Sequence, residues 1–156
     1  MKCRNKLSKK ITVAIFFILL SSFAYPQTAE RLERLLTSDT VSYEDAAHFV
    51  LEAADVFAAS NPAEALGYAL ERGWLPKRAA AGGTARLDGV SLLIMRSFNI
   101  QGGLFYRITK APHYAYREMV YQNVIQGSND PAMAVSGDIL LFMLNRVLSY
   151  KEANQL

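Results

Sequence analysis

Residues 62–100 have the sequence PAEALGYALERGWLPKRAAAGGTARLDGVSLLIMRSFNI, and they align without a gap on residues 112–150, PHYAYREMVYQNVIQGSNDPAMAVSGDILLFMLNRVLSY. The aligned pairs include Pro62 and Pro112, Leu75 and Ile125, Asp88 and Asp138, and Arg96 and Arg146. Identities are few, but the apolar positions coincide, which predicts a repeated helical unit. Chance similarity between two amphipathic helices is the alternative, and the shared proline and the absence of a gap argue against it.

Each copy has the pattern of a helix, an apolar turn, a polar loop and a second helix. In the first copy, Asn61 can cap a helix that opens with Pro62 and stops at Gly73. The loop 76–83 (PKRAAAGG) contains helix breakers, and a helix over about 86–98 follows with apolar residues at helical spacing.

In the second copy, a helix over 112–123 leads into the loop 127–131 (GSNDP), and Ser136 is placed to cap the last helix. Upstream, Ser42 and Asp45 have the spacing of a capping box that opens a helix through about Phe57. A short helix over Thr28 to Leu36 is expected before it. The segment Gly102 to Thr109 (GGLFYRIT) is expected to be a short extended stretch or an irregular loop.

These patterns predict an all-α fold of helix-loop-helix repeats in residues 25–156. A partial unit covers 28–57, full units cover 60–100 and 111–150, and residues 101–110 form a linker. Because a helical pair cannot bury its apolar face alone, we expect the units to pack around one core.

The first 24 residues are expected to be a cleaved signal peptide. Five basic residues precede the apolar run ITVAIFFILL (11–20), which is too short to cross a bilayer. Small residues at Ser22 and Ala24 predict cleavage after Ala24, with Ala29 as the weaker site; a retained anchor is the alternative. Cys3, the single cysteine, precedes the apolar run, so a lipoprotein is not expected. We therefore expect a periplasmic or extracellular protein without disulfides.

The net charge of +3 belongs mainly to this N-terminal segment. Removing the segment leaves twelve basic residues against fourteen acidic ones, a net charge of −2. The basic pI therefore does not indicate a nucleic-acid partner.

Residues 116–148 resemble a divergent S-layer homology (SLH) repeat. The resemblance is carried by VYQNVIQGSNDP (120–131), by VSGDILLFMLNRVL (135–148), and by a closing Leu-x-Arg-x-Leu pattern at Leu144, Arg146 and Leu148. The whole chain is also similar to small exported proteins of spirochaetes. The SLH resemblance implies attachment to cell-envelope polysaccharide.

In the SLH family this attachment uses a Thr-Arg-Ala-Glu motif at the start of the second helix. The corresponding stretches here are 42–45 (SYED), 86–89 (RLDG) and 136–139 (SGDI). The motif's arginine is missing from all three, and only the first keeps the acid, as Asp45. Ser42 and Ser136 are more simply interpreted as helix N-caps.

One surface is a candidate binding site. Tyr114, Arg117 and Tyr121 share one helix face, and the tyrosines align with Glu64 and Glu71 of the first copy, acids expected to face water. Exposed aromatic rings beside a guanidinium suit a protein partner or a sugar face. The patch is extended by three further candidates, Tyr106, Arg107 and His113. Packing of this face on residues 102–109 is the alternative.

No catalytic, cofactor or metal site is predicted. His48 is expected in or at the border of the core, and two isolated histidines do not make a zinc site. Asp88 and Asp138 lie in first helical turns, where a carboxylate favours the helix dipole.

We therefore expect a non-enzymatic periplasmic or cell-envelope interaction module that binds a protein partner or, less favoured, a cell-wall glycan. One alternative is an envelope hydrolase or accessory subunit that brings Asp88, Asp138, Glu118 or a histidine into a cleft. Another is a purely structural envelope scaffold.

Overall fold

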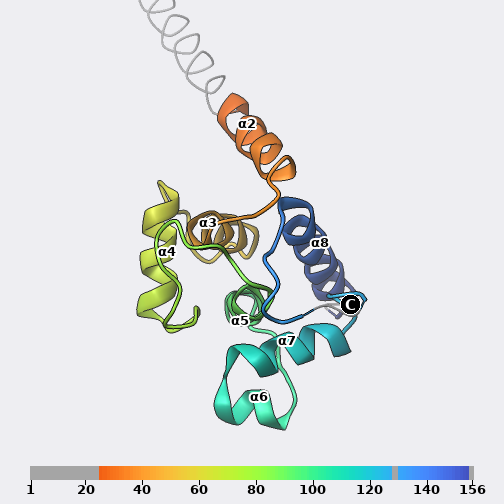
Figure 1. Cartoon of the computed structure of the whole chain (residues 1–156). Helices are drawn as coiled ribbons and strands as arrows, with labels where there is room; N and C mark the ends of the chain where they lie inside the picture. Colours follow the sequence, from red (N-terminus) through yellow and green to blue (C-terminus); the bar gives the residue numbers. More distant parts are fainter. Residues whose placement is uncertain (1–24, 128–129, 155–156) are drawn as a thin grey trace, which may run out of the picture. The chain divides into compact units, whose positions relative to one another are not determined.

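The computed structural model describes residues 25–127 and 130–154, and within these ranges every regular element is a helix (Figure 1). The helices are α2 (Tyr25–Leu36), α3 (Tyr43–Ala53), α4 (Pro62–Glu71), α5 (Leu87–Ser97), α6 (Leu104–Thr109), α7 (Pro112–Tyr121) and α8 (Gly137–Asn154). The predicted all-α class is confirmed. The expected signal peptide and Cys3 lie outside the described residues. Within the ranges described, no helix combines the length and apolar character that crossing a bilayer requires.

The chain divides into two compact units, one ending at Leu35 and one beginning at Leu36, so α2 is described by itself. It begins at Tyr25, three residues before the expected start, and ends at Leu36 as expected. Arg34 pairs with Glu30 one turn earlier, at 2.5 Å between Nη2 and Oε1. Both side chains are exposed, so this pair contributes little to stability.

Two predicted helix caps are confirmed. The Ser42 hydroxyl accepts a hydrogen bond from the Asp45 amide at 3.1 Å and donates one to the Asp45 carboxylate at 2.6 Å. The Asn61 side-chain oxygen accepts from the Glu64 amide at 2.9 Å, and Pro62 occupies the first turn. Each cap satisfies an amide that the helix cannot pair internally.

The bounds of the later helices follow the 50-residue offset. Both ends of α4 and α7 are 50 residues apart, as are the starts of α5 and α8. Gly73 and Asn123, also 50 apart, both have left-handed backbone, with φ of 64° and 57°. The organisation of the chain as helix-loop-helix repeats stays a prediction.

Three buried residues close a ring of backbone hydrogen bonds. The Val41 amide donates to the Val135 carbonyl (2.8 Å), the Val135 amide to the Ala85 carbonyl (2.9 Å), and the Ala85 amide to the Val41 carbonyl (2.8 Å). Each residue precedes a helix, so the ring brings the starts of α3, α5 and α8 together. Their amides would otherwise be buried without partners, at considerable cost.

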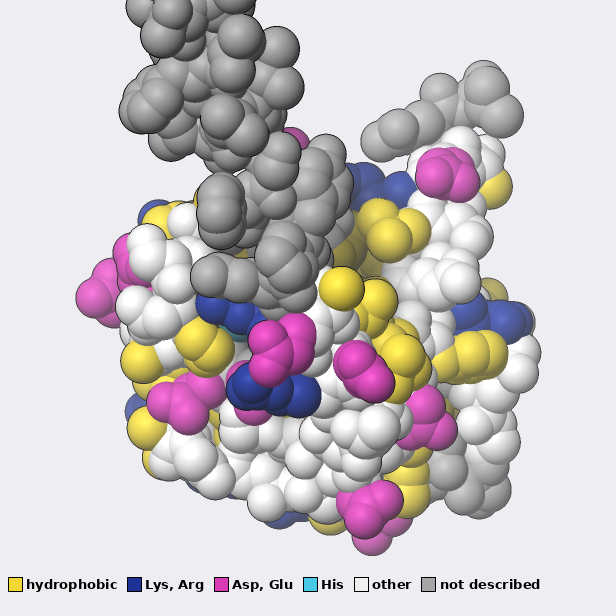
Figure 2. Space-filling model, turned by 90° about the horizontal axis from the view of Figure 1, so that it is seen from above, with side chains coloured by type: hydrophobic (Ala, Val, Ile, Leu, Met, Phe, Trp, Pro, Cys, Tyr) yellow, Lys and Arg dark blue, Asp and Glu magenta, His cyan; other side chains and the backbone are white. Residues whose placement is uncertain are grey.

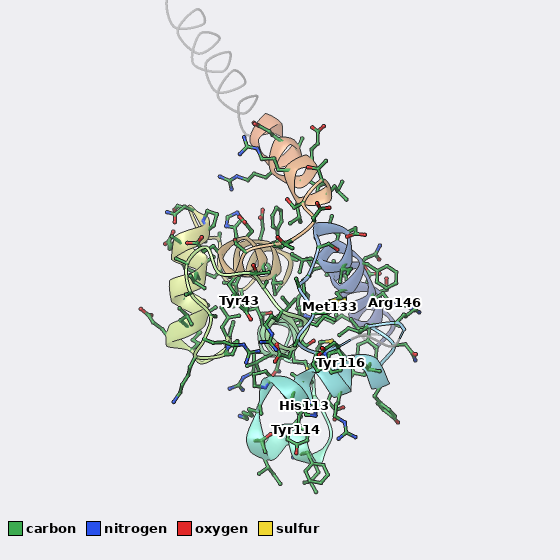
Figure 3. The ribbon with its side chains drawn as sticks, viewed as in Figure 1. Tyr43, His113, Tyr114, Tyr116, Met133 and Arg146 are labelled. Atoms are coloured by element: carbon green, nitrogen blue, oxygen red, sulfur yellow. The ribbon has the colours of Figure 1, made fainter. Side chains whose placement is uncertain are left out.

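A second layer of three hydrogen bonds links the same three segments in pairs. Tyr43 donates to Gly83 (2.9 Å), Leu87 to Met133 (3.0 Å) and Gly137 to Ser38 (3.0 Å), each through its backbone amide. The two labelled members of this layer, Tyr43 and Met133, lie toward the middle of the molecule in Figure 3. The ring and this second layer hold the starts of three helices that are distant in sequence close together.

Helix α5 is the centre of the core, because ten of its eleven residues are buried. It packs against α3 and α7, and α3 also packs against α4 (Figure 1). The hydroxyls of Ser91 and Ser97 donate to the carbonyls of Leu87 (2.6 Å) and Leu93 (2.7 Å). Each of these two buried hydroxyls therefore has a hydrogen-bond partner.

The expectation for Gly102 to Thr109 was wrong, because residues 104–109 form the helix α6. Gly103 precedes this helix, and Lys110 ends it in left-handed backbone with φ of 50°. The Thr109 hydroxyl donates to the Phe105 carbonyl at 2.8 Å. Tyr106, the only buried residue of α6, supplies a tertiary anchor that compensates for weak helix propensity.

Candidate binding surface

The predicted tyrosine-arginine face lies on α7, which begins at Pro112. Arg117 is exposed, and Tyr121 is 83% exposed. Tyr114 is half-buried. The exposure of Glu64 and Glu71, from which the face was inferred, is confirmed.

Tyr114 is half-buried because it stacks on α6. Its ring lies 5.6 Å from that of Phe105 at 15°, and His113 contacts it edge-on at 5.6 Å. Figure 3 places His113 and Tyr114 beside α6. Phe105 itself remains 65% exposed, so the stack extends the surface rather than covering it. Tyr114 thus packs partly on α6, while Arg117 and Tyr121 remain exposed, and binding by this face stays a prediction.

Helix α6 contributes three apolar side chains that the sequence analysis did not single out. Leu104, Phe105 and Ile108 are 66%, 65% and 72% exposed. They lie at positions i, i+1 and i+4, which one helix face can present together. Helical spacing could have identified these three residues. Because the segment was expected to be extended or irregular, helical spacing was not applied to it. The α6–α7 face is defined by Leu104, Phe105, Ile108, His113, Tyr114, Arg117 and Tyr121.

Tyr106 does not belong to this face, which corrects its placement there. Its side chain is 5% exposed and turns inward. A Cβ at Gly102 would lie 2.6 Å from the Tyr106 ring and 3.1 Å from Cγ of Glu118, so glycine permits this close packing. Arg107 is exposed, as expected, but it lines a hollow together with Tyr106.

The surroundings of the α6–α7 face are mainly basic. Arg107, Lys110 and Arg117 are exposed, while Glu118 is partly buried with its carboxylate directed at Gly103. Figure 2 looks down on the molecule from above the view of Figure 1. That view shows the side opposite α6, and on this side acidic and basic side chains lie beside one another. The α6–α7 face therefore combines apolar side chains with local positive charge.

A second hollow, of about 540 Å³, lies between the end of α7 and the outer face of α8. It is lined by Gln122, Asn123, Val124, Phe142, Asn145, Arg146, Ser149 and Tyr150. The Arg146 guanidinium lies 5.2 Å from the centre of the exposed Phe142 ring. Aromatic rings, amides and a hydroxyl are groups that can contact a sugar.

The acids considered for hydrolysis have other partners. Asp88 is 8% exposed, and both its carboxylate oxygens accept from Arg78, at 2.6 and 2.5 Å. Hydrogen bonding to Asp88 raises the pKa of Arg78. Asp138 accepts from the Ser136 hydroxyl, which lowers the pKa of this exposed carboxyl. Ser136, the predicted N-cap of α8, thus donates its hydrogen bond to a side chain in the first turn of that helix.

The histidines lie in different environments. His48 is 6% exposed, as expected, and its Nε2 lies 3.8 Å from the Glu52 carboxylate. His113 is exposed. In residues 25–127 and 130–154, no three His, Cys, Asp or Glu side chains gather in a way that could hold a metal ion.

Comparisons with protein-family models, with curated proteins and with solved structures give no match to this chain. The SLH resemblance therefore stays a prediction that rests on the residues quoted for it.

Proposed function

We propose that this protein is an exported, non-enzymatic interaction module that binds a partner protein of the cell envelope through the α6–α7 face. The observation that carries the proposal is the exposure of Leu104, Phe105, Ile108 and Tyr121, between 65% and 83%. Single exposed apolar residues are ordinary, but a group of large ones on adjoining helices is typical of an interaction site.

The composition of the face favours a protein over a sugar as the main ligand. Exposed leucine and isoleucine gain from burial against another apolar surface, which a hydroxyl-rich sugar does not offer. Tyrosine and arginine, here Tyr121 and Arg117, are the residue types that dominate binding energy at protein interfaces. The stacked pair of Phe105 and Tyr114 gives the site a preformed aromatic centre.

The charges define the partner further. Arg107, Lys110 and Arg117 are exposed on or next to the same two helices and attract acidic groups. The expected partner surface is an apolar patch bordered by aspartate and glutamate. Export places the encounter outside the cytoplasm, and this part of the proposal rests on the N-terminal sequence of residues 1–24.

Affinity capture from envelope extract tests the proposal. The whole chain, tagged at its C-terminus, is compared with the pair Phe105→Ser and Ile108→Ser. The pair Val56→Ser and Leu70→Ser is the matched control, because these residues are also exposed and apolar, at 38% and 37%. We expect one protein that is retained by wild type and control, and lost from the α6 variant. Equal retention by all three proteins would refute the site.

A cell-wall glycan is the second candidate, supported by the hollow between α7 and α8. Phe142 and Tyr150 expose aromatic surface there beside three amide side chains. Binding to isolated cell-wall polysaccharide that is lost on Phe142→Ala and Tyr150→Ala, but kept in the α6 variant, would favour this function instead.

A further inference from the structure

A separate, smaller hollow lies where the chain leaves α5 and returns through α6. Its volume is about 220 Å³. It is lined by Met95, Arg96, Asn99, Ile100, Gln101, Gly102, Tyr106, Arg107 and Lys110. Asn99 and Lys110 both have left-handed backbone, with φ of 52° and 50°, and each stands where a helix has ended. These two turns bring residues from both helices to one opening.

Three of the lining residues are basic and none is acidic. Within the described part of the chain, no carboxylate lies within 4.0 Å of the charged nitrogens of Arg96, Arg107 or Lys110. Glu118 interacts electrostatically with Tyr106, but its carboxylate lies against Gly103 and it is not one of the lining residues. Like charges brought together without counterions repel one another, so the site is stabilised when an anion enters.

The remaining polar groups are also suited to an anion. The Nε–H group of Arg96 is buried and has no hydrogen-bond partner among the described atoms. A guanidinium can only donate hydrogen bonds, so the partner that this group lacks is an acceptor. Tyr106 lines the hollow, and its hydroxyl can act as a donor because tyrosine is protonated at neutral pH. Burial and the nearby Glu118 raise the pKa of Tyr106, and Arg96 opposes that rise. The Asn99 amide adds two more donors.

We propose that this hollow, with Arg96, Arg107, Lys110 and Tyr106 as donors, is a binding site for a compact phosphate-type oxyanion. Arginine binds phosphate in bidentate geometry, and lysine binds it as a point charge. The volume exceeds the roughly 30 Å³ of one water several-fold, but it is below the roughly 300 Å³ of pockets for larger ligands. The site goes beyond the proposed protein interaction, since it takes a small anion into the hollow, although Arg107 and Lys110 also belong to the charges near the α6–α7 face. Its phosphate can come from a free anion or from a lipid headgroup.

Titration of the protein with inorganic phosphate tests the proposal. Amide chemical shifts, measured at neutral pH, report the binding. The protein is recovered from cells that express the whole chain. The variant Arg107→Gln with Lys110→Gln removes two exposed cations and is expected to keep the fold. The control Arg72→Gln with Lys77→Gln removes the same charge at exposed positions outside the hollow. Wild type and control should show saturable shifts in residues 95–110, and the variant should bind about tenfold more weakly or worse.

A parallel arm uses vesicles of phosphatidylglycerol and of phosphatidylcholine. Saturable binding of inorganic phosphate would assign a free anion to the site. Binding only to phosphatidylglycerol vesicles, lost in the Arg107 and Lys110 variant but kept in the control, would assign a headgroup phosphate. Either result supports the proposal. It is overturned if neither probe binds, or if the variant and the control lose binding equally, since that would indicate general charge attraction.

Discussion

Replacing Gly89 by alanine should destabilise the protein through one contact between α3 and α5. A Cβ at Gly89 would lie 2.6 Å from the Tyr43 hydroxyl oxygen and 2.8 Å from its Cε1. Tyr43 is 2% exposed and its backbone amide donates to the Gly83 carbonyl, so its side chain cannot move aside freely. Overpacking of this kind costs about 1–3 kcal/mol. Alanine returns up to about 1 kcal/mol through better helix propensity.

Gly67→Ala is the matched control, because Gly67 is also inside a helix and its Cβ would meet nothing within 4 Å. This variant should gain roughly 0.5–1 kcal/mol, so the two alanine substitutions should differ in sign. Urea unfolding of both variants measures the difference. Adding Tyr43→Phe to Gly89→Ala should recover part of the loss, since the closest atom is removed. Stabilisation by Gly89→Ala equal to that by Gly67→Ala would refute the described packing.

Three further predictions concern stability. Arg78→Ala should lower the free energy of unfolding in urea by about 1–2 kcal/mol. This is less than for a fully buried ion pair, because Arg78 is 44% exposed while Asp88 is nearly buried. An unchanged unfolding midpoint would contradict the pairing. Asn61→Ala should cost about 1 kcal/mol by removing the α4 cap, and Asn61→Asp should not. The raised pKa of Tyr106 means that the unfolded chain loses this proton first, so stability should fall as pH rises above about 10. Tyr106→Phe should make that fall shallower, and an unchanged pH profile would argue against the burial.

Local signals explain what the sequence could predict. The starts of α3 and α4 were predicted because Ser42, Asn61 and Pro62 act within a few residues of themselves. Helix α5 was predicted from apolar periodicity, which does not depend on partners elsewhere, and α7 and α8 from the similar pattern 50 residues later. The expected helix through Phe57 instead ends at Ala53, since helix ends are weakly specified.

The features that the sequence could not predict depend on contacts between residues far apart in the chain. The backbone ring of Val41, Ala85 and Val135 has no side-chain signature, because any residue supplies an amide and a carbonyl. Helix α6 depends on Tyr106, whose burial against distant residues is invisible to local periodicity. Arg78 lies in a loop ten residues before Asp88, so only the fold brings them together.

Photo-cross-linking from Ile108 tests the central claim most directly. Ile108 is 72% exposed on the α6–α7 face, and Leu70 on α4 is an exposed control at 37%. With a photoreactive phenylalanine analogue at one position or the other in the whole chain, we expect one discrete adduct with an envelope protein from position 108. That adduct should weaken with Arg117→Glu, which reverses a charge beside the contact. The same adducts from both positions, or none from position 108, would contradict the α6–α7 face as the binding site.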